Sequence, residues 1–214
     1  MIKLLKGNKP QILIDNEVSW TADYVAKRAA GQKLTDAEAA RHRHPEIKTA
    51  LKIETHKKCA YCESKPLHVT HGDVEHIVPK SLHPNKAYEW GNLTLACDGC
   101  NTNKGAKEDI VDPYLIDPVD VFIIYGALIL PRPESGDAIY TEKSLKLNRL
   151  DLVERREKRI KELYHLVCLA RNAPDDKSRE AIKQDIIENE VLDSVEYAAF
   201  SKKYVMDMIA EGIL

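Results

Sequence analysis

The sequence predicts an α+β fold in which a small metal-stapled core is flanked by helices on both sides. Two Cys-x2-Cys pairs in the middle of the chain enclose a short strand pattern. Residues 121–130 are rich in β-branched and aliphatic side chains, which indicates a hairpin or a bent strand pair. From residue 150 to residue 208, apolar side chains recur at helical spacing in three stretches. The expected segments are 1–56 for an N-terminal arm and helices, 57–110 for the core, and 111–214 for the hairpin and a helical extension.

The N-terminal segment is expected to contain an extended arm and three short helices. Residues 1–18 show little periodicity, and Ser19 can cap a helix that runs to about Ala30. Residues 35–38 have the form of a capping box, which predicts a second helix start. Pro45 suits the first turn of a third helix.

Size and composition exclude several classes of protein. A chain of 214 residues suits one domain with an extension. The longest apolar run, residues 121–130, is far shorter than the roughly eighteen residues that a transmembrane helix needs. Residues 1–7 are too short and too interrupted for a signal peptide. We therefore expect a cytoplasmic protein.

The formal net charge of −2 conceals an uneven distribution. Residues 41–107 carry 11 Lys and Arg against 7 Asp and Glu, whereas residues 172–214 carry 5 against 10. The basic cluster at residues 41–44 could contact phosphates, although a solvated helix end is the simpler interpretation. An acidic C-terminal face would repel nucleic acid or bind a basic partner.

The two cysteine pairs predict a structural zinc site. In a reducing compartment such pairs are more often metal ligands than disulfides. Four thiolates complete a tetrahedron and leave no open position for a substrate. Gly99 is expected in a left-handed turn of the second pair. Cysteines that are buried or redox-active without a metal are the alternative. The predicted ligands are Cys59, Cys62, Cys97 and Cys100.

An acid–histidine pair lies between the cysteine pairs. Strand alternation puts Glu75 and His76 on opposite sides, unless a strand end or a bulge turns one of them. Pro79 cannot continue a central strand, so the strand should end close to His76. We expect an exposed imidazole there that could take a proton from water; a structural core histidine is the alternative.

Three short segments resemble the HNH nuclease motif in its variant with four cysteines. They are Glu75-His76-Ile77-Val78-Pro79-Lys80, Trp90-Gly91-Asn92-Leu93-Thr94-Leu95, and Cys97-Asp98-Gly99-Cys100-Asn101 followed by Lys104. The third motif position, often histidine, is asparagine here. The resemblance implies a ββα-metal fold, in which a loop joins two strands and a helix packs across them.

The same resemblance implies roles for individual residues. His76 would be the general base that activates water, and Asn92 would hold the loop and the backbone of His76. Asn101 with Glu75 would bind one divalent cation, Mg²⁺ or Mn²⁺, whose open positions can neutralise phosphate charge. Asn103 competes with Asn101 as the ligand.

Other polar residues near the motif have less specific expectations. Lys80 and Lys104 are candidate phosphate contacts, with ordinary solvated lysines as the alternative. His68, His71 and His83 are expected to be loop residues.

Segments outside the motif resemble the small nuclease subunit of Septu-type anti-phage systems, and the nucleases that accompany some retrons. This resemblance implies a bacterial protein that works with an ABC-type ATPase, which would sense infection and hold the nuclease in check. The C-terminal helices would be the docking surface. The similar segments are Met1-Ile2-Lys3, Lys9-Pro10, the region of Trp20, Cys59-Ala60-Tyr61-Cys62-Glu63, Asp112-Pro113 and residues 145–150.

The expected function is therefore hydrolysis of phosphodiester bonds in nucleic acid, with DNA as the expected substrate. A stand-alone restriction or homing nuclease would have the same site without an ATPase. A non-catalytic zinc-ribbon module would bind nucleic acid through the basic centre alone. A nicking assay with Mn²⁺ separates the catalytic readings from the binding module.

Overall fold

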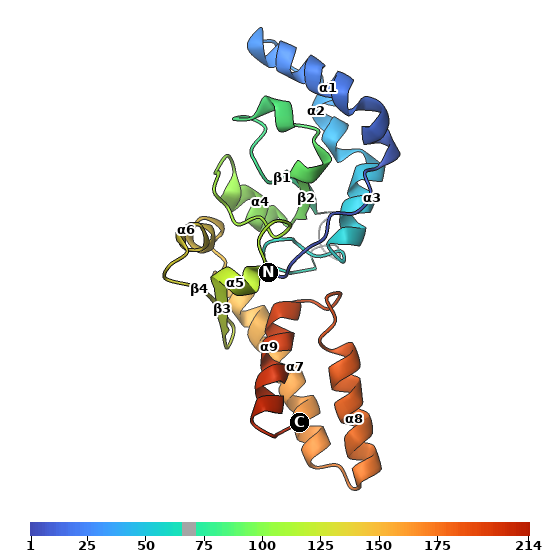
Figure 1. Cartoon of the computed structure of the whole chain (residues 1–214), viewed down its shortest axis with the longest axis vertical. Helices are drawn as coiled ribbons and strands as arrows, with labels where there is room; N and C mark the ends of the chain where they lie inside the picture. Colours follow the sequence, from blue (N-terminus) through green and yellow to red (C-terminus); the bar gives the residue numbers. More distant parts are fainter. Residues whose placement is uncertain (66–71) are drawn as a thin grey trace.

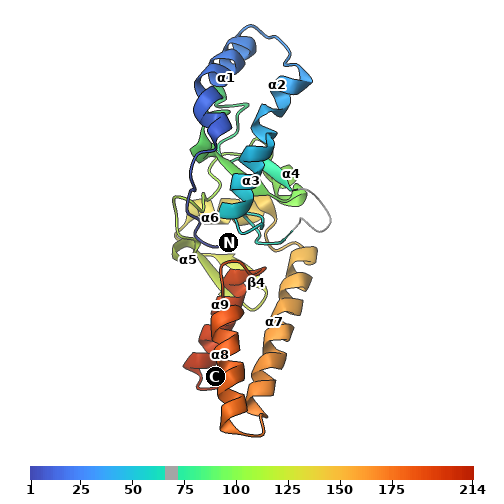
Figure 2. The same cartoon turned by 90° about the vertical axis from the view of Figure 1, so that its right-hand side faces the viewer.

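The structure is a computed structural model that describes residues 1–65 and 72–214. The molecule is elongated, with the N-terminal helices at one end and three C-terminal helices at the other (Figures 1 and 2). A small ββα unit lies between them, and the N-terminus itself lies near the middle of the molecule. This arrangement is an α+β fold, as the sequence predicted.

The first helix begins earlier than the sequence indicated. Helix α1 spans Gln11–Ala29, so the predicted arm is shorter and Ser19 is not a cap. The Ser19 hydroxyl instead donates to the carbonyl of Asn16 within the helix. The N-cap residue of α1, Pro10, offers no side-chain cap, and the backbone N–H of Ile12 in the first turn donates to the carboxylate of Glu46 at 3.3 Å. Burial of Leu13 anchors this end of the helix in its place.

The next two helices begin where their capping residues predict. Thr35 and Glu38 form the reciprocal capping box of α2 (Asp36–Ala40). A 3₁₀ turn, η1 (Arg41–Arg43), leads to α3 (Pro45–Glu54), which begins with the expected proline.

The ββα unit is formed by two antiparallel strands and the helix that follows them. Strand β1 (Asp73–His76) pairs with β2 (Leu93–Ala96), so that Glu75 lies opposite Thr94 and His76 opposite Leu93. Helix α4 (Asp98–Lys104) packs against β1, and α3 contacts β2 (Figure 1). The unit matches the predicted ββα core.

The segment after the core contains the predicted hairpin and two helices that were not predicted. Strands β3 (Phe122–Tyr125) and β4 (Leu128–Pro131) pair antiparallel across a turn at Gly126, whose φ is +55°. A short helix, α5 (Pro118–Val121), precedes the hairpin. Helix α6 (Gly136–Leu145) follows it, capped by Ser135.

Three helices form the C-terminal extension, as the apolar periodicity predicted. They pack through Leu163, Val167, Ile186 and Val205, which are all buried. Within the described part of the chain, no helix combines the length and the apolar character that a bilayer crossing requires. The helices are α7 (Leu150–Arg171), α8 (Asp176–Asn189) and α9 (Ala198–Ala210).

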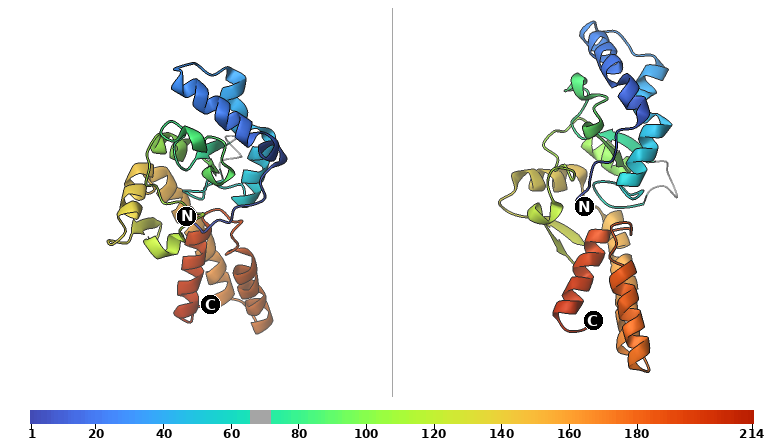
Figure 3. Two further views of the ribbon diagram at one scale, coloured as in Figure 1. Left: turned by 45° about the horizontal axis from the view of Figure 1, so that its top comes forward. Right: turned by 45° about the vertical axis from the view of Figure 1, so that its right-hand side comes forward.

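One hydrophobic cluster joins all three predicted segments. It extends from Met1 through the cysteines to Phe122, Tyr197 and Phe200. Figure 3 shows the N-terminus beside the junction of the core and the C-terminal helices. The division at residues 56/57 and 110/111 stays a prediction.

Glu63 ties this junction together with polar contacts. Its buried carboxylate accepts hydrogen bonds from the Met1 amino group at 2.6 Å and from Lys58 at 3.2 Å. It also accepts from the backbone N–H of Ala199 in α9 at 3.2 Å. Because Glu63 directly follows Cys62, the C-terminal helices are attached next to the cysteine cluster.

Candidate nuclease site

The four predicted cysteines meet in one buried cluster. Their sulfur atoms all lie within 4.8 Å of one another. The Sγ atoms of Cys62 and Cys97 are 3.7 Å apart. A tetrahedral zinc with sulfur bonds of about 2.3 Å requires sulfur–sulfur distances of about 3.8 Å. The four side chains therefore fit a zinc ion.

Secondary structure places these ligands. Cys97 is the N-cap of α4, and its Sγ accepts a hydrogen bond from the backbone N–H of Cys100 at 3.4 Å. Gly99 lies inside this helix, so the expected left-handed turn is wrong. A Cβ at this position would stand 3.2 Å from Nη2 of Arg149, which gives a different reason for glycine.

Arg149 brings a positive charge to the sulfur cluster from outside the core. Its Nη1 lies 3.7 Å from the sulfur of Cys100, and its Nη2 lies 3.9 Å from the sulfur of Cys97. Four thiolates around a divalent ion carry a net negative charge, which a guanidinium partly neutralises.

His76 lies at the end of β1, as predicted, but it is buried rather than exposed. Its Nε2 is 2.9 Å from the carbonyl oxygen of Ala87. Because a carbonyl only accepts, Nε2 carries the hydrogen and Nδ1 keeps its lone pair. Burial, with the nearby charge of Lys80, lowers the pKa of His76 to about 3, so the imidazole is neutral.

Asn92 fixes the loop that follows His76. Its Oδ1 accepts from the backbone N–H of Val78 at 2.7 Å. Its Nδ2 donates to the carbonyls of Val78 at 2.9 Å and of Lys86 at 3.0 Å. The side chain therefore holds the loop through Val78 and Lys86, and its contacts are not with the His76 backbone itself.

The acidic side chains of β1 face α4. The Glu75 carboxylate pairs with Lys104 at 2.9 Å, and Nδ2 of Asn101 donates to Asp73 at 2.8 Å. Burial raises the pKa of Glu75, although Lys104 opposes that shift. Asn101 thus contacts Asp73 rather than Glu75. Mg²⁺ and Mn²⁺ prefer hard oxygen donors. The carboxylate oxygens of Asp73 and Glu75 and the Oδ1 atom of Asn101 are donors of this kind.

The two candidate lysines have different surroundings. Lys104 is fully buried and also donates to the carbonyl of His76 at 2.8 Å, so the expected phosphate contact is not available to it. Lys80 remains partly accessible, and its Nζ lies 3.3 and 3.4 Å from the two ring nitrogens of His42. Asn103 donates to the carbonyl of Leu145 at 3.2 Å, which links α4 to α6.

Two residues beside the site were not assigned from the sequence. Strand alternation places Asp73 on the same face as Glu75, a pattern that could have identified it. His42 belongs to the basic cluster of η1, and its ring centroid lies 4.9 Å from that of His76. Only the packing of η1 against β1 brings these two histidines together.

Of the three flanking histidines, only His83 lies within the described residues. His83 contacts Glu108 on the chain segment that follows α4. His68 and His71 lie outside the described residues.

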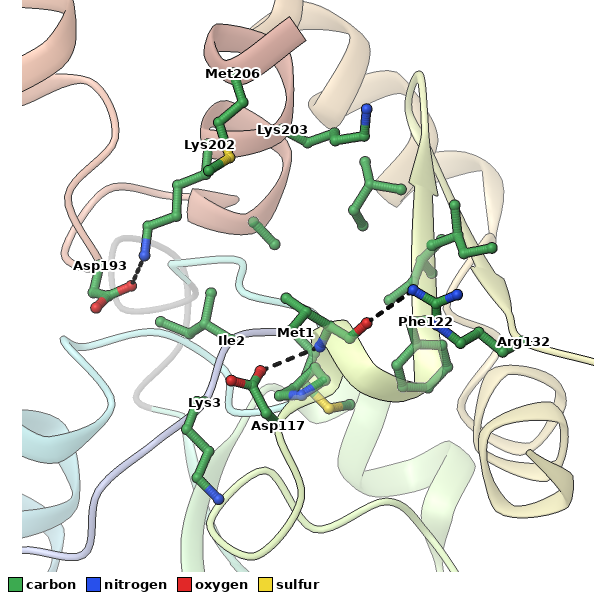
Figure 4. Close-up of a pocket in the computed structure, with 16 residues that line it drawn as sticks. Met1, Ile2, Lys3, Asp117, Phe122, Arg132, Asp193, Lys202, Lys203 and Met206 are labelled. Carbon is green, nitrogen blue, oxygen red and sulfur yellow. Dashed lines mark hydrogen bonds and ion pairs between the residues drawn. The ribbon is translucent and has the colours of Figure 1, made fainter. Parts of the chain in front are cut away.

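A separate apolar cavity of about 430 Å³ lies between the N-terminal residues, the β3–β4 hairpin and α9 (Figure 4). Its polar rim is engaged within the protein: Lys202 pairs with Asp193 at 2.6 Å, and Arg132 donates to the carbonyl of Val119 at 3.3 Å. The described residues that line it include none of the nuclease motif.

Comparison with known proteins agrees with this geometry. Residues 59–107 match the family described as HNH endonuclease. The Septu protein PtuB of Bacillus thuringiensis is 30% identical over 156 residues, which cover 71% of this chain and 56% of that protein. The match thus spans little more than half of the relative's length. Residues 59–107 are therefore similar to HNH endonucleases, within a chain that resembles a Septu protein along most of its length.

Proposed function

We propose that this protein is a metal-dependent endonuclease that hydrolyses phosphodiester bonds, with DNA as its substrate. The observation that carries the proposal is the state of His76: a neutral imidazole whose Nε2 is bound to Ala87 and whose Nδ1 has no hydrogen-bond partner among residues 1–65 and 72–214. In the chain, His76 directly follows Glu75, which belongs to the group of oxygen donors on β1 and α4.

His76 would act as the general base. A water molecule that attacks phosphorus must lose a proton, and Nδ1 is the ring atom able to accept it. The Ala87 carbonyl would hold the ring orientation and stabilise the imidazolium that forms. Asn92 would keep the loop from Val78 to Lys86 folded around the ring.

Glu75 and Asn101, with Asp73 as a further candidate, would hold a Mg²⁺ or Mn²⁺ ion. When bound, such an ion neutralises charge that develops on the phosphate oxygens. The cysteine cluster would hold Zn²⁺ as a purely structural ion, because four thiolates leave no position for substrate.

A plasmid-nicking assay with Mn²⁺ tests the assignment. His76→Ala should lower the cleavage rate at least about 100-fold, the usual contribution of a general base. Lys183→Ala on α8 is the matched surface control and should cleave like the unmodified protein. Full activity of His76→Ala, at unchanged zinc content and melting temperature, would remove the proposed base. A matching RNA substrate shows which nucleic acid is cut.

The similarity to a Septu protein supports a role as the nuclease effector of a bacterial anti-phage system with an ABC-type ATPase. The C-terminal helices α7–α9, which carry none of the nuclease motif, would bind that ATPase. Co-expression with the ATPase encoded beside the gene should yield a stable complex on size-exclusion chromatography. Separate elution of the two proteins would contradict this partner.

A further inference from the structure

Three cations gather on the N-terminal side of the nuclease site. Arg43 of η1 is exposed, Lys48 of α3 is half-buried, and Lys80 follows β1. Across residues 1–65 and 72–214, none of the three forms an ion pair with a carboxylate. Arg43 lies close enough to repel both lysines: burial and then the charge of Arg43 lower the pKa of Lys80 to about 8, and the charge of Arg43 also contributes to the lowered pKa of Lys48, which is due mainly to burial. An anion placed between them would relieve this repulsion.

His42 connects this group of cations to the nuclease site. Its buried ring lies against His76, with 4.9 Å between the centroids, and one of its ring nitrogens can accept a hydrogen bond from the ammonium of Lys80. His42 and Lys80 come from segments that are 38 residues apart, so the contact depends on the packing of η1.

The cations are spread along the length of β1. Lys80 lies beside His42 and His76 at the end of the strand, while Lys48 lies within electrostatic range of Asp73 at its start. From Asp73 to His76 the strand advances about 10 Å, at about 3.3 Å per residue. One DNA strand carries a phosphate for every 3.4 Å of its axis, so a surface of this length can face more than one phosphate.

We propose that Arg43, Lys48 and Lys80 form a binding surface for backbone phosphates that flank the scissile bond, with His42 as the residue that positions Lys80. The substrate class rests on the proposed nuclease function. Arg43 and Lys48 lie outside the matched residues 59–107, so the N-terminal helices would supply part of the substrate surface.

The test measures binding without cleavage. The whole protein is titrated against a fluorescein-labelled 20-base-pair DNA duplex without added divalent cation, and anisotropy is followed at several salt concentrations. Each lost phosphate contact lowers the slope of log K against log salt by about 1. Arg43→Gln combined with Lys48→Gln should therefore lower the slope by about 2 and weaken binding about 30- to 100-fold at 0.1 M salt.

Lys161→Gln combined with Arg171→Gln is the matched control. It removes the same two charges from exposed positions on α7. Its slope and affinity should equal those of the unmodified protein. Equal losses in both double variants, or no loss in the first, would overturn the proposal. If duplex binding shows the expected slopes but Mn²⁺ supports no nicking, the phosphate surface stands and the nuclease function fails.

A second pair of variants tests the positioning role. His42→Leu should lower the salt slope as much as Lys80→Gln does, and the two changes together should lower it no further. His42→Gln, which keeps a hydrogen-bond acceptor for the ammonium, should restore the slope. Additive losses, or a His42→Leu protein that is less stable but has an unchanged slope, would assign His42 a structural role only.

Discussion

His76 shows how the immediate neighbours of one side chain prepare it for the role proposed for it. A histidine that is to take a proton from water must be neutral, and burial keeps the His76 imidazole in that state. The Ala87 carbonyl then selects which nitrogen carries the hydrogen. The neighbouring ring of His42 is buried as well, and burial with the charge of Lys80 lowers its pKa to about 2.

These two histidines should make the fold sensitive to acid. The unfolded chain protonates both near pH 6.5, but the folded protein does not, so stability is full above pH 6.5 and falls as the pH drops below it. At pH 5 each histidine should cost about 2 kcal/mol relative to pH 8. Urea unfolding at the two pH values measures this loss. His42→Gln should reduce the loss by about half, and an unchanged loss would show that His42 is not kept neutral.

The buried amide of Asn92 should be important for stability as well as for activity. Asn92→Ala leaves backbone groups of Val78 and Lys86 without partners, which should cost about 2–4 kcal/mol of unfolding free energy. Asn189→Ala, at an exposed position on α8, serves as the control and should cost less than about 0.5 kcal/mol. A similar, small effect at both positions would contradict the bracing role of Asn92.

Residues within the motif could be predicted because chain order already places them together. The four cysteines, His76 and Asn92 belong to that class: the four sulfur atoms meet in one cluster, and Asn92 binds the loop that follows His76. His42 could not be found in this way, because its contact with His76 exists only through tertiary packing. The sequence suggested a phosphate contact for Lys104. Nothing in the sequence shows that the ammonium group of Lys104 instead contacts Glu75 and the carbonyl of His76.

At the level of elements, helix starts followed the capping chemistry. α2 and α3 begin where a capping box and a first-turn proline predict, because those residues satisfy or remove unpaired N–H groups. α1 has no side-chain cap, so its start was misplaced. α6 was missed although Ser135 caps it, since its short sequence lacks a continuous apolar stripe.

The residue at the start of α7 should affect how tightly the cysteine cluster holds zinc. Arg149, its N-cap residue, lies over the sulfurs of Cys97 and Cys100. Arg149→Gln should therefore release zinc more readily, with an affinity about 10- to 100-fold lower. A chelator competition followed by the absorbance of a zinc indicator measures this, and Arg155→Gln on the same helix is the control. Identical release from both variants would show that the guanidinium does not act on the thiolates.

On the scale of the whole molecule, the cysteine cluster belongs to a core that extends from Met1 to Phe200. Structural zinc contributes on the order of 10 kcal/mol to the folding of small zinc domains. Cys59→Ala should therefore lose zinc and unfold the ββα unit, and should also loosen α9. Hydrogen exchange of α9 amides, measured with zinc content, checks this. Normal protection of α9 in a zinc-free protein would show that the two regions are independent.

The shared core is the part of the fold that could not be predicted from the sequence. Local patterns predicted the helices, the hairpin and the ββα unit one by one. They could not show that Tyr197 and Phe200 belong to the same core cluster as Cys62, because these residues lie more than a hundred positions apart in the sequence. The three expected segments are therefore joined more closely than their separate patterns suggest.

The contacts of Glu63 bear on any attempt to transplant this nuclease. An excised cassette of residues 57–110 would leave behind the backbone N–H of Ala199 and the apolar cover of Tyr197. The carboxylate of Glu63, next to the predicted metal ligand Cys62, would then be exposed to solvent with fewer hydrogen-bond donors around it. Engineers who want this cleavage chemistry in a fusion protein should carry α9 along with it.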